Sequence, residues 1–360
     1  MKNYAFIFGT EIVRQFGELT SSAASTRLRA IYPGLLLANS DTRVHLLHAS
    51  DIEKIETILN AERIDAVVVG KVFDNQYVPR LVEGLRTAKL KGTKIVLDIC
   101  DYSFSGGESA DIQNALISFC DRLVVNTEQM RSRVLDLNSL IGVDVIPDPC
   151  EIDEPCPPST QIIDFNRVVV FGNKKNGEWL HNQIIKRDSR CLETIHFEYH
   201  GMIDEEIVDW LVRLKPLYHS KSVSVTASLW NGTWIQSQAL KRSGVAYLPG
   251  DTQSASSMTK SSNRLLICIM LGVPTITYPQ PSYLEFESPS VIVSDNLWDG
   301  YEKLKNVPLH QVNGSIIENQ QFVRQRYSKQ VVSNLWRQVL EEILTQSGSG
   351  PFAGEVTRQN

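Results

Sequence analysis

The sequence predicts an α/β protein built from two Rossmann-like, doubly wound domains, and three observations support this fold class. Short runs rich in β-branched and aromatic residues alternate with helix-length amphipathic segments along the chain. Most of these runs are continuously apolar, which is typical of parallel strands covered by helices on both faces. The alternation is interrupted once, by the proline-rich and acidic stretch DPCEIDEPCPPSTQ at 148–161, which has the composition of an exposed linker.

The alternation before this linker predicts an N-terminal domain over residues 1–150. Amphipathic segments between most of its apolar runs predict the helices that cover the sheet. The expected strands are YAFIFG (4–9), RVHLLHA (43–49), DAVVVGKV (65–72), KIVLDIC (94–100), RLVVNT (122–127) and VDVIPD (143–148).

The pattern restarts after the linker and predicts a second domain over residues 151–315. One long amphipathic helix is expected at 316–345, because apolar residues recur there at spacings of three and four and form a single stripe. The Gly/Ser-rich segment 346–360 is expected to be a flexible tail. The expected strands are RVVVFGN (167–173), HFEYHG (196–201), SVSVTAS (222–228), GVAYLPGD (244–251), PTITYP (274–279) and SVIVSD (290–295).

Composition excludes several classes of protein. The chain has 360 residues, of which 42% are hydrophobic and 21% charged, and this is ordinary for a two-domain globular protein. A formal net charge of −5 argues against general nucleic-acid binding, because no basic excess is available for a phosphate backbone. Six irregularly spaced cysteines indicate neither a zinc site nor a disulfide framework. No signal peptide or membrane-spanning run is recognised, so we expect a cytoplasmic protein.

The segment MTKSSNRLLICIMLGVPTITYP at 258–279 contains a helix start that is suited to an anion. Polar and basic residues precede an apolar helix that ends at Gly272 and leads directly into an apolar strand. A helix N-terminus presents free N–H groups and a partial positive charge. A well-capped helix with two solvated cations is the structural alternative. The candidate phosphate-binding residues are Lys260, Ser261, Ser262, Asn263 and Arg264.

Further candidate ligand-binding residues follow other predicted strands of the second domain. Ligands of doubly wound folds bind at the carboxyl ends of the strands, and two facing domains create a cleft there. Asn173, Lys174 and Lys175 follow the first of these strands, where the two lysines offer a second phosphate contact. Gly201 ends the second strand and Asp251 ends the fourth, where the chain could form a wall of a nucleotide pocket. Plain surface loops are the competing interpretation.

The order of these motifs resembles glycosyltransferases of the two-Rossmann GT-B architecture. KSSNRLLICIMLGVPTITYP resembles their donor-site segment, FCDRLVVNTEQMRSRVLDL with VDVIPDPCEI resembles the end of their N-terminal domain, and KGTKIVLDICDYSF resembles their fourth strand and acceptor-side loop. The resemblance implies a C-terminal donor domain, an N-terminal acceptor domain, and a C-terminal helix that crosses back. The large retaining branch carries two glutamates where this chain has Thr259 and Ile267, which leaves donor identity and stereochemistry open.

The N-terminal domain offers candidates for catalysis and for acceptor binding. Asp98 and Asp101 lie where a predicted strand ends, and an inverting transfer needs a base for the acceptor hydroxyl proton. We favour Asp101 as that base, with Asp98 orienting the loop. Ser25, Arg27 and Arg29 lie at a helix start, where related enzymes often hold acceptor or donor phosphate. Loop hydrogen bonding for Asp98 and a solvated helix face for the arginines are the alternatives.

The combined prediction is a metal-independent glycosyltransferase of polysaccharide, lipopolysaccharide or glycolipid assembly, without a cofactor. Its partners would be a nucleotide sugar and a saccharide or lipid-linked acceptor, with peripheral association at the inner face of the membrane left open. Two other functions stay open: a nucleotide-sugar epimerase on the same fold, and a non-catalytic nucleotide-sugar binding subunit. The base, the sugar, the acceptor, the stereochemistry and the oligomeric state are not determined by the sequence.

Overall fold

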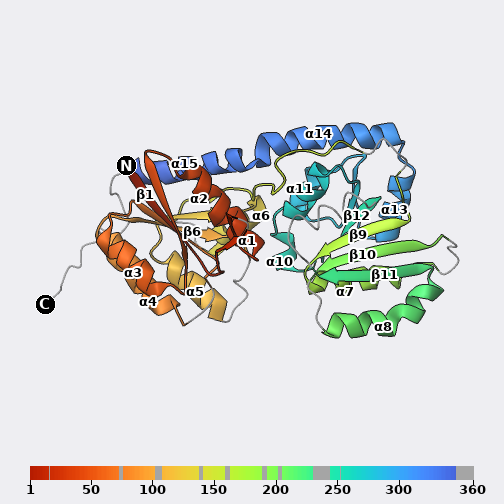
Figure 1. Ribbon diagram of the computed structural model, residues 1–360, viewed down its shortest axis with the longest axis horizontal. Coiled ribbons are helices and arrows are strands. Elements are labelled where there is room, and N and C mark those ends of the chain that lie inside the picture. The colour runs from red at the N-terminus through yellow and green to blue at the C-terminus, as the bar shows by residue number, and fades with distance from the viewer. Residues whose placement is uncertain are drawn as a thin grey trace.

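The computed structural model confirms the predicted fold class, an α/β protein with two parallel sheets and a long C-terminal helical segment (Figure 1). We call the part from β1 to β8 the first lobe and the part from β9 to α13 the second lobe. Among the described helices, none combines the length and the apolar character needed to cross a membrane. The structure describes residues 1–15, 17–72, 76–101, 108–137, 141–158, 163–188, 193–201, 205–229, 244–251 and 253–345.

The first lobe contains a six-stranded parallel sheet in the order β4-β1-β5-β6-β7-β8. A two-stranded hairpin, β2–β3, follows β1. The strands are β1 (Lys2–Phe8), β2 (Val13–Gln15), β3 (Glu18–Thr20), β4 (Thr42–His48), β5 (Ala66–Gly70), β6 (Lys94–Ile99), β7 (Arg122–Val125) and β8 (Val143–Val145). The helices are α1 (Ala24–Thr26), the π-helix η1 (Arg27–Ile31), α2 (Tyr32–Leu37), α3 (Ile52–Ala61), α4 (Val78–Leu90), α5 (Glu108–Ile117) and α6 (Glu128–Leu137).

The second lobe repeats this architecture, with six parallel strands in the order β11-β10-β9-β12-β13-β14. Its strands are β9 (Arg167–Gly172), β10 (Ile195–Gly201), β11 (Val223–Leu229), β12 (Val245–Leu248), β13 (Thr275–Thr277) and β14 (Val291–Val293). Its helices are α7 (Lys174–Ile184), α8 (Glu205–Ser220), α10 (Ala255–Met258), α11 (Asn263–Met270), α12 (Pro281–Leu284) and α13 (Leu297–Lys305).

The C-terminal segment forms two helices instead of the single helix expected at 316–345. Helix α14 covers Leu309–Tyr327, helix α15 covers Lys329–Thr345, and the two run along one side of both lobes (Figure 1). Ser328 between them has an extended backbone. The carbonyl of Tyr327 accepts a hydrogen bond from the backbone N–H of Cys150 in the linker at 2.7 Å. The helix therefore breaks where the interlobe linker crosses it.

Apolar packing places α15 against the first lobe. Trp336 is fully buried and its ring lies 5.8 Å from that of Phe6 on β1, in an edge-to-face arrangement. Val332, Leu340 and Ile343 belong to the same buried cluster. The opposite face of this sheet is covered by α3, α4, α5 and α6. One face of the first sheet is therefore completed by residues from the far end of the chain.

The strand order of each sheet reverses once. In the first sheet the reversal lies between β1 and β5, and in the second it lies between β9 and β12. Such switch points open crevices at the carboxyl ends of the strands, where doubly wound folds bind their ligands. The two carboxyl edges face each other, because Thr127 after β7 donates a hydrogen bond to the carbonyl of Thr259 at 3.0 Å. The fold thus brings two switch points into one interlobe region.

Candidate functional site

Arg264 lies at the switch point of the second sheet. Its Nη1 donates to the carbonyl of Phe171 on β9 at 3.2 Å, and its Nη2 donates to the carbonyl of Pro249 after β12 at 3.4 Å. Gly172 beside it has a φ of 145°, and a Cβ there would lie 3.1 Å from Arg264 Nη1. Carbonyl acceptors orient the guanidinium but leave its charge uncompensated. Arg264 therefore presents a positive charge at the position where the fold predicts a ligand.

Lys260 brings a second cation to the same region. Its backbone carbonyl accepts hydrogen bonds from Gln280 Nε2 and Ser282 Oγ, both at 2.8 Å, and Gln280 is fully buried. Burial lowers the pKa of the Lys260 ammonium; Asp101 opposes this effect, and Arg264 with two further lysines reinforces it. Its main chain therefore holds Lys260 close to other cations. An anionic ligand would reduce the repulsion between these charges.

The first lobe contributes an ion pair, Lys71–Asp101, to this environment. Lys71 Nζ lies 2.8 Å from Asp101 Oδ2, and both side chains are partly exposed. Lys71 directly follows β5 and has a φ of 51°, in the left-handed region. A Cβ on Gly9, directly after β1, would lie 2.2 Å from the Lys71 carbonyl oxygen. Burial alone would lower the pKa of Lys71, but the Asp101 carboxylate outweighs it and the net direction is upward.

Lys71 is a residue that our sequence reasoning missed. It occupies the end of the expected strand 65–72, so its position after a strand was visible in the sequence. What the sequence did not show is that β1 and β5 are neighbours and that their ends form the switch point. We define the cation cluster as Lys71, Lys175, Lys260 and Arg264, because the other three members all act electrostatically on Lys260.

Asp98 forms a fully buried ion pair with Arg29. Arg29 Nη2 donates to Asp98 Oδ1 at 2.6 Å and Arg29 Nε to Oδ2 at 3.1 Å, and neither side chain is exposed. Burial raises the pKa of Asp98, and Arg29 acts against this. Arg29 Nη1 also donates to the carbonyl of Ile146 and to Asp148 Oδ1. This geometry favours a structural role for Asp98 over that of a base.

Arg27 and Arg29 were expected to bind a phosphate, and their positions do not favour that role. Arg27 is 8% exposed, and its Nε donates to Glu151 Oε1 of the linker at 2.8 Å. Its Nη1 donates to the carbonyl of Ser21 at 2.6 Å. Arg29 also stacks over Trp336, with its guanidinium carbon 5.2 Å from the ring centre. Both arginines therefore attach the first lobe to the segment 146–151. The hydroxyl of Ser25 is buried and has no hydrogen-bond partner among the described residues.

The three polar residues between Lys260 and Arg264 serve mainly the interlobe contact and the core. Ser261 Oγ donates to Asp148 Oδ2 at 2.6 Å. Ser262 is 4% exposed. Asn263 begins α11, and its Oδ1 is buried without a partner within the described part of the chain. The two cations of the motif therefore lie in the cleft, whereas the two serines serve the contacts that hold the cleft together.

The start of α7 and the end of β12 form the remaining wall. Asn173 precedes α7; its N–H donates to Asn176 Oδ1 at 2.9 Å, and its carbonyl accepts from Tyr199 Oη at 2.8 Å. Lys175 is exposed and Lys174 is partly buried. These contacts fix the turn that presents both lysines at the carboxyl end of β9.

Gly201 and Asp251 both lie after strands of the second sheet. A Cβ on Gly201 would lie 2.7 Å from the backbone oxygen of Gly172, so only glycine fits there. Asp251 Oδ1 accepts a hydrogen bond from the N–H of Gln253 at 2.8 Å, within its own turn.

Part of the predicted acceptor side lies outside the described residues. The loop 102–107, which continues LDICDYSF after Asp101, belongs to it. Among the described residues, no group of three or more His, Cys, Asp or Glu side chains is arranged to hold a metal ion. The roles of all these site residues stay predictions.

Comparison with solved structures shows that the chain has the GT-B fold. It matches a trehalose-6-phosphate synthase, OtsA, with a TM-score of 0.61 and 10% identity over 95% of this chain and 92% of that chain. An α-glucosyltransferase solved with UDP-glucose and DNA containing an abasic site matches with a TM-score of 0.60 and 9% identity, over 95% of this chain and 99% of that chain. TarM matches with a TM-score of 0.60 and 11% identity, but this chain spans only 57% of the length of TarM. Similarly, the chain spans 60% of the matched chain in the GtfA/B complex. No protein-family model matches the sequence, and no curated protein matches it.

Proposed function

We propose that this protein transfers a sugar from a nucleotide-sugar donor to a saccharide or lipid-linked acceptor, in the cytoplasm and without a metal. The observation that carries the proposal is the cation cluster, which combines Lys71 of the first lobe with Lys175, Lys260 and Arg264 of the second. A diphosphate between the two switch points would neutralise this cluster. Two of the GT-B neighbours support the same class of reaction, because AviGT4 is described as a glycosyltransferase and another neighbour as an α-glucosyltransferase.

The proposed chemistry follows from where charge develops. The bond between the anomeric carbon and the phosphate oxygen breaks, and a bond from the acceptor oxygen to that carbon forms. Negative charge grows on the departing diphosphate, where Lys260 and Arg264 would stabilise it. The acceptor hydroxyl proton passes to Asp101, which neutralises the partner of Lys71 and frees that ammonium for the phosphate. Nucleoside diphosphate and the glycosylated acceptor are the products.

One observation favours a non-catalytic nucleotide-sugar binding subunit as the second candidate. Thr259 and Ile267 occupy the positions of the glutamates in the retaining branch, and both are 2% exposed. The carbonyl of Thr259 is bonded to Thr127, and Ile267 packs in the core of the second lobe. Neither side chain offers a polar group to a donor sugar from such a position. A binding subunit would bind nucleotide but would turn over no donor with any acceptor.

A nucleotide screen tests the shared premise of both candidates. UDP, GDP, ADP, TDP and CMP are compared by thermal shift, because a ligand that binds only the folded state raises the melting temperature. At least one nucleotide should give a saturable shift. The best nucleotide is then used as its sugar conjugate with saccharide acceptors, and acceptor-dependent release of nucleotide separates a transferase from a binding subunit. Absence of a shift with every nucleotide would refute the proposal.

Arg264→Ala provides the residue-level test. Loss of a charge-assisted hydrogen bond should weaken nucleotide binding by about 1.5–3 kcal/mol. The control is Arg324→Ala, which removes an exposed arginine from α14. Because Arg264 also bonds two backbone carbonyls, melting of the free protein is measured for both variants. Unchanged nucleotide affinity in a folded Arg264→Ala protein would remove this residue from the site.

A further inference from the structure

Gln280 is a fully buried amide between β13 and α12, and it holds the main chain that leads into α11. Its Nε2 donates to the carbonyl of Lys260 at 2.8 Å and to that of Ser261 at 3.0 Å. The hydroxyl of Ser282 accepts from the same amide and donates to the Lys260 carbonyl at 2.8 Å. Two consecutive carbonyls before α11 are therefore bound by one side chain.

The orientation of this amide is fixed from its other end. Tyr278 Oη donates to Gln280 Oε1 at 2.5 Å, and Tyr278 is itself buried. Backbone carbonyls can only accept hydrogen bonds, so the amide nitrogen must face Lys260 and Ser261 and the amide oxygen must face the tyrosine. Both ends of the Gln280 amide thus have partners, and a flipped amide would lose them.

The direction of the two carbonyls determines where the next N–H groups point. The carbonyl and the N–H of a trans peptide unit point in opposite directions, and no described peptide bond is cis. The carbonyls of Lys260 and Ser261 point to Gln280, so the N–H groups of Ser261 and Ser262 point away from it. Neither N–H has a hydrogen-bond partner among the described residues. Both donors adjoin the cation Lys260.

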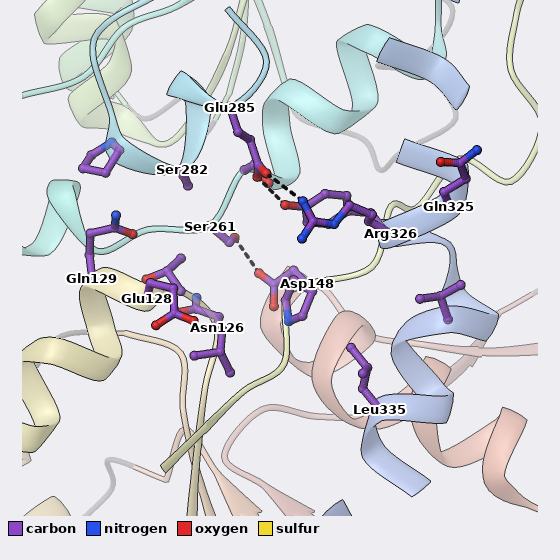
Figure 2. Close-up of a pocket in the computed structure, with 17 residues that line it drawn as sticks. Asn126, Glu128, Gln129, Asp148, Ser261, Ser282, Glu285, Gln325, Arg326 and Leu335 are labelled. Atoms are coloured by element: carbon purple, nitrogen blue, oxygen red, sulfur yellow. Dashed lines mark hydrogen bonds and ion pairs between the residues drawn. The ribbon is translucent and has the colours of Figure 1, made fainter. Parts of the chain in front are cut away.

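The same segment is also anchored toward the first lobe. Figure 2 shows the side chain of Ser261 pointing to Asp148, at the start of the linker, and Ser261 Oγ donates to Asp148 Oδ2 at 2.6 Å. If the Gln280 amide were removed, the Ser261 carbonyl would lose this buried donor and the peptide would rotate toward another one. Such a rotation would also redirect the N–H of Ser262 and the main chain that carries Lys260.

From these contacts we infer that Gln280 is a positioning residue for the diphosphate of the donor. It fixes the main chain of Lys260 and Ser261, so that the Lys260 ammonium and the adjoining N–H groups are oriented before the ligand binds. Gln280 is fully buried and acts through these groups without touching the ligand. The inference rests on the proposed function, because it assumes that a diphosphate binds at the cation cluster.

The test replaces Gln280 with a side chain of similar size that cannot donate. Gln280→Met and the wild-type protein are titrated by calorimetry with UDP, GDP, ADP or TDP, whichever the wild type binds most tightly. Loss of the two hydrogen bonds should weaken diphosphate binding about tenfold. A folded Gln280→Met protein with wild-type affinity would overturn the inference.

Gln320 provides a matched control at the opposite end of α11. It is also buried, and its Nε2 donates to the carbonyls of Cys156 and Ile269 at 2.7 and 3.0 Å. Gln320→Met removes the same kind of contact far from the cation cluster. It should lower the melting temperature as Gln280→Met does, but it should keep the diphosphate affinity. Equal losses of affinity in both variants would make the role of Gln280 purely structural.

A double variant tests whether Gln280 acts through Lys260. In a Lys260→Ala background, Gln280→Met should cost clearly less diphosphate affinity than it does alone, because residues that act together are not additive. Tyr278→Phe, which removes only the hydroxyl that orients the amide, replaces Gln280→Met if that protein does not fold. It should weaken diphosphate binding about threefold. Full additivity, or no loss in a folded Tyr278→Phe protein, would contradict the positioning role.

The wild-type titration separates this inference from the proposed function. A wild-type protein that binds none of the nucleotides refutes the proposed function, and the role of Gln280 fails with it. A wild-type protein that binds a diphosphate, together with unaffected glutamine and tyrosine variants, overturns the role of Gln280 alone.

Discussion

The helix starts at α1–η1 and at α11 both carry basic residues, and they use them differently. At α1–η1 of the first lobe, Arg27 and Arg29 face the carboxylates of Glu151 and Asp98 and are almost fully buried. At α11 of the second lobe, Arg264 donates to two backbone carbonyls and also interacts with the hydroxyl of Tyr283. Lys260 before that helix is surrounded mainly by other cations. The first group is neutralised inside the protein, whereas the second keeps an excess of charge.

The difference shows what makes a buried cation available to a ligand. A carboxylate that neutralises a guanidinium fixes it, and removing either partner leaves an uncompensated charge in the interior. Carbonyls orient a guanidinium without neutralising it, so a phosphate can still be attracted. A basic residue at a helix start is therefore ambiguous until the acidic residues that reach it are known. The following predictions test this contrast, from the largest effect to the smallest.

The largest effect is expected from Arg29→Met. This change leaves Asp98 and Asp148 buried without their cation, so the free energy of unfolding should fall by about 3–5 kcal/mol. Chemical denaturation measures it, with Arg324→Met on the surface of α14 as control. Adding Asp98→Asn should recover part of the loss, since the two residues interact directly. A stable Arg29→Met protein that has lost nucleotide binding would contradict this contrast, because Arg29 would then serve the ligand and not the buried carboxylates.

The next effect is on turnover. If Asp101 accepts the acceptor proton, Asp101→Asn should lower the rate by about 10²-fold or more, with little change in donor affinity. Asp98→Asn is the comparison: it should reduce stability more than turnover per folded molecule, because Asp98 is enclosed with Arg29. Near-normal turnover of Asp101→Asn would assign this carboxylate to the positioning of Lys71 alone.

A smaller effect is expected with pH. The pKa of Lys260 is lowered from 10.5, chiefly by burial, so nucleotide affinity should fall at less alkaline pH than for an exposed lysine. The contribution of Lys260 to the stability of the free protein should change in the opposite direction to the nucleotide affinity as the pH rises. Between the lowered pKa and 10.5, the folded state binds fewer protons than the unfolded state at this residue, so its contribution to stability rises with pH. Lys260→Arg should abolish this pH-dependent fall in nucleotide affinity. Binding of the uncharged nucleoside should show no such fall. An unchanged fall in Lys260→Arg would assign it to another group.

The smallest expected effect is that of chelation. If the lysine ammonium groups and the arginine guanidinium group neutralise the leaving diphosphate, EDTA should leave turnover unchanged. Activity is measured after exhaustive dialysis against EDTA, and again after magnesium or manganese is added. Loss of turnover that either metal restores would contradict the metal-independent proposal.

The sequence predicted what local patterns determine. Continuous apolar runs gave the parallel strands, and the proline-rich stretch gave the connection between the two sheets. The break at Ser328 was missed; the Tyr327 carbonyl beside it accepts a hydrogen bond from Cys150, and that contact is far away in sequence. The same limit applies to the site: the partners of Arg27 and Arg29 lie 124 and 69 residues further along the chain. Lys71 needed the strand order, which no local pattern contains.

The burial of Trp336 has a consequence for the order of folding during synthesis. Trp336 packs on Phe6, so one face of the first sheet is closed by a helix that is translated after the whole of the second lobe. N-terminal domains usually fold first as the chain emerges. Here the second lobe can complete its core while the first still exposes Tyr4, Phe6 and Phe8. The first lobe to be translated is thus the last to be finished, and its open face is what a chaperone would meet on the nascent chain.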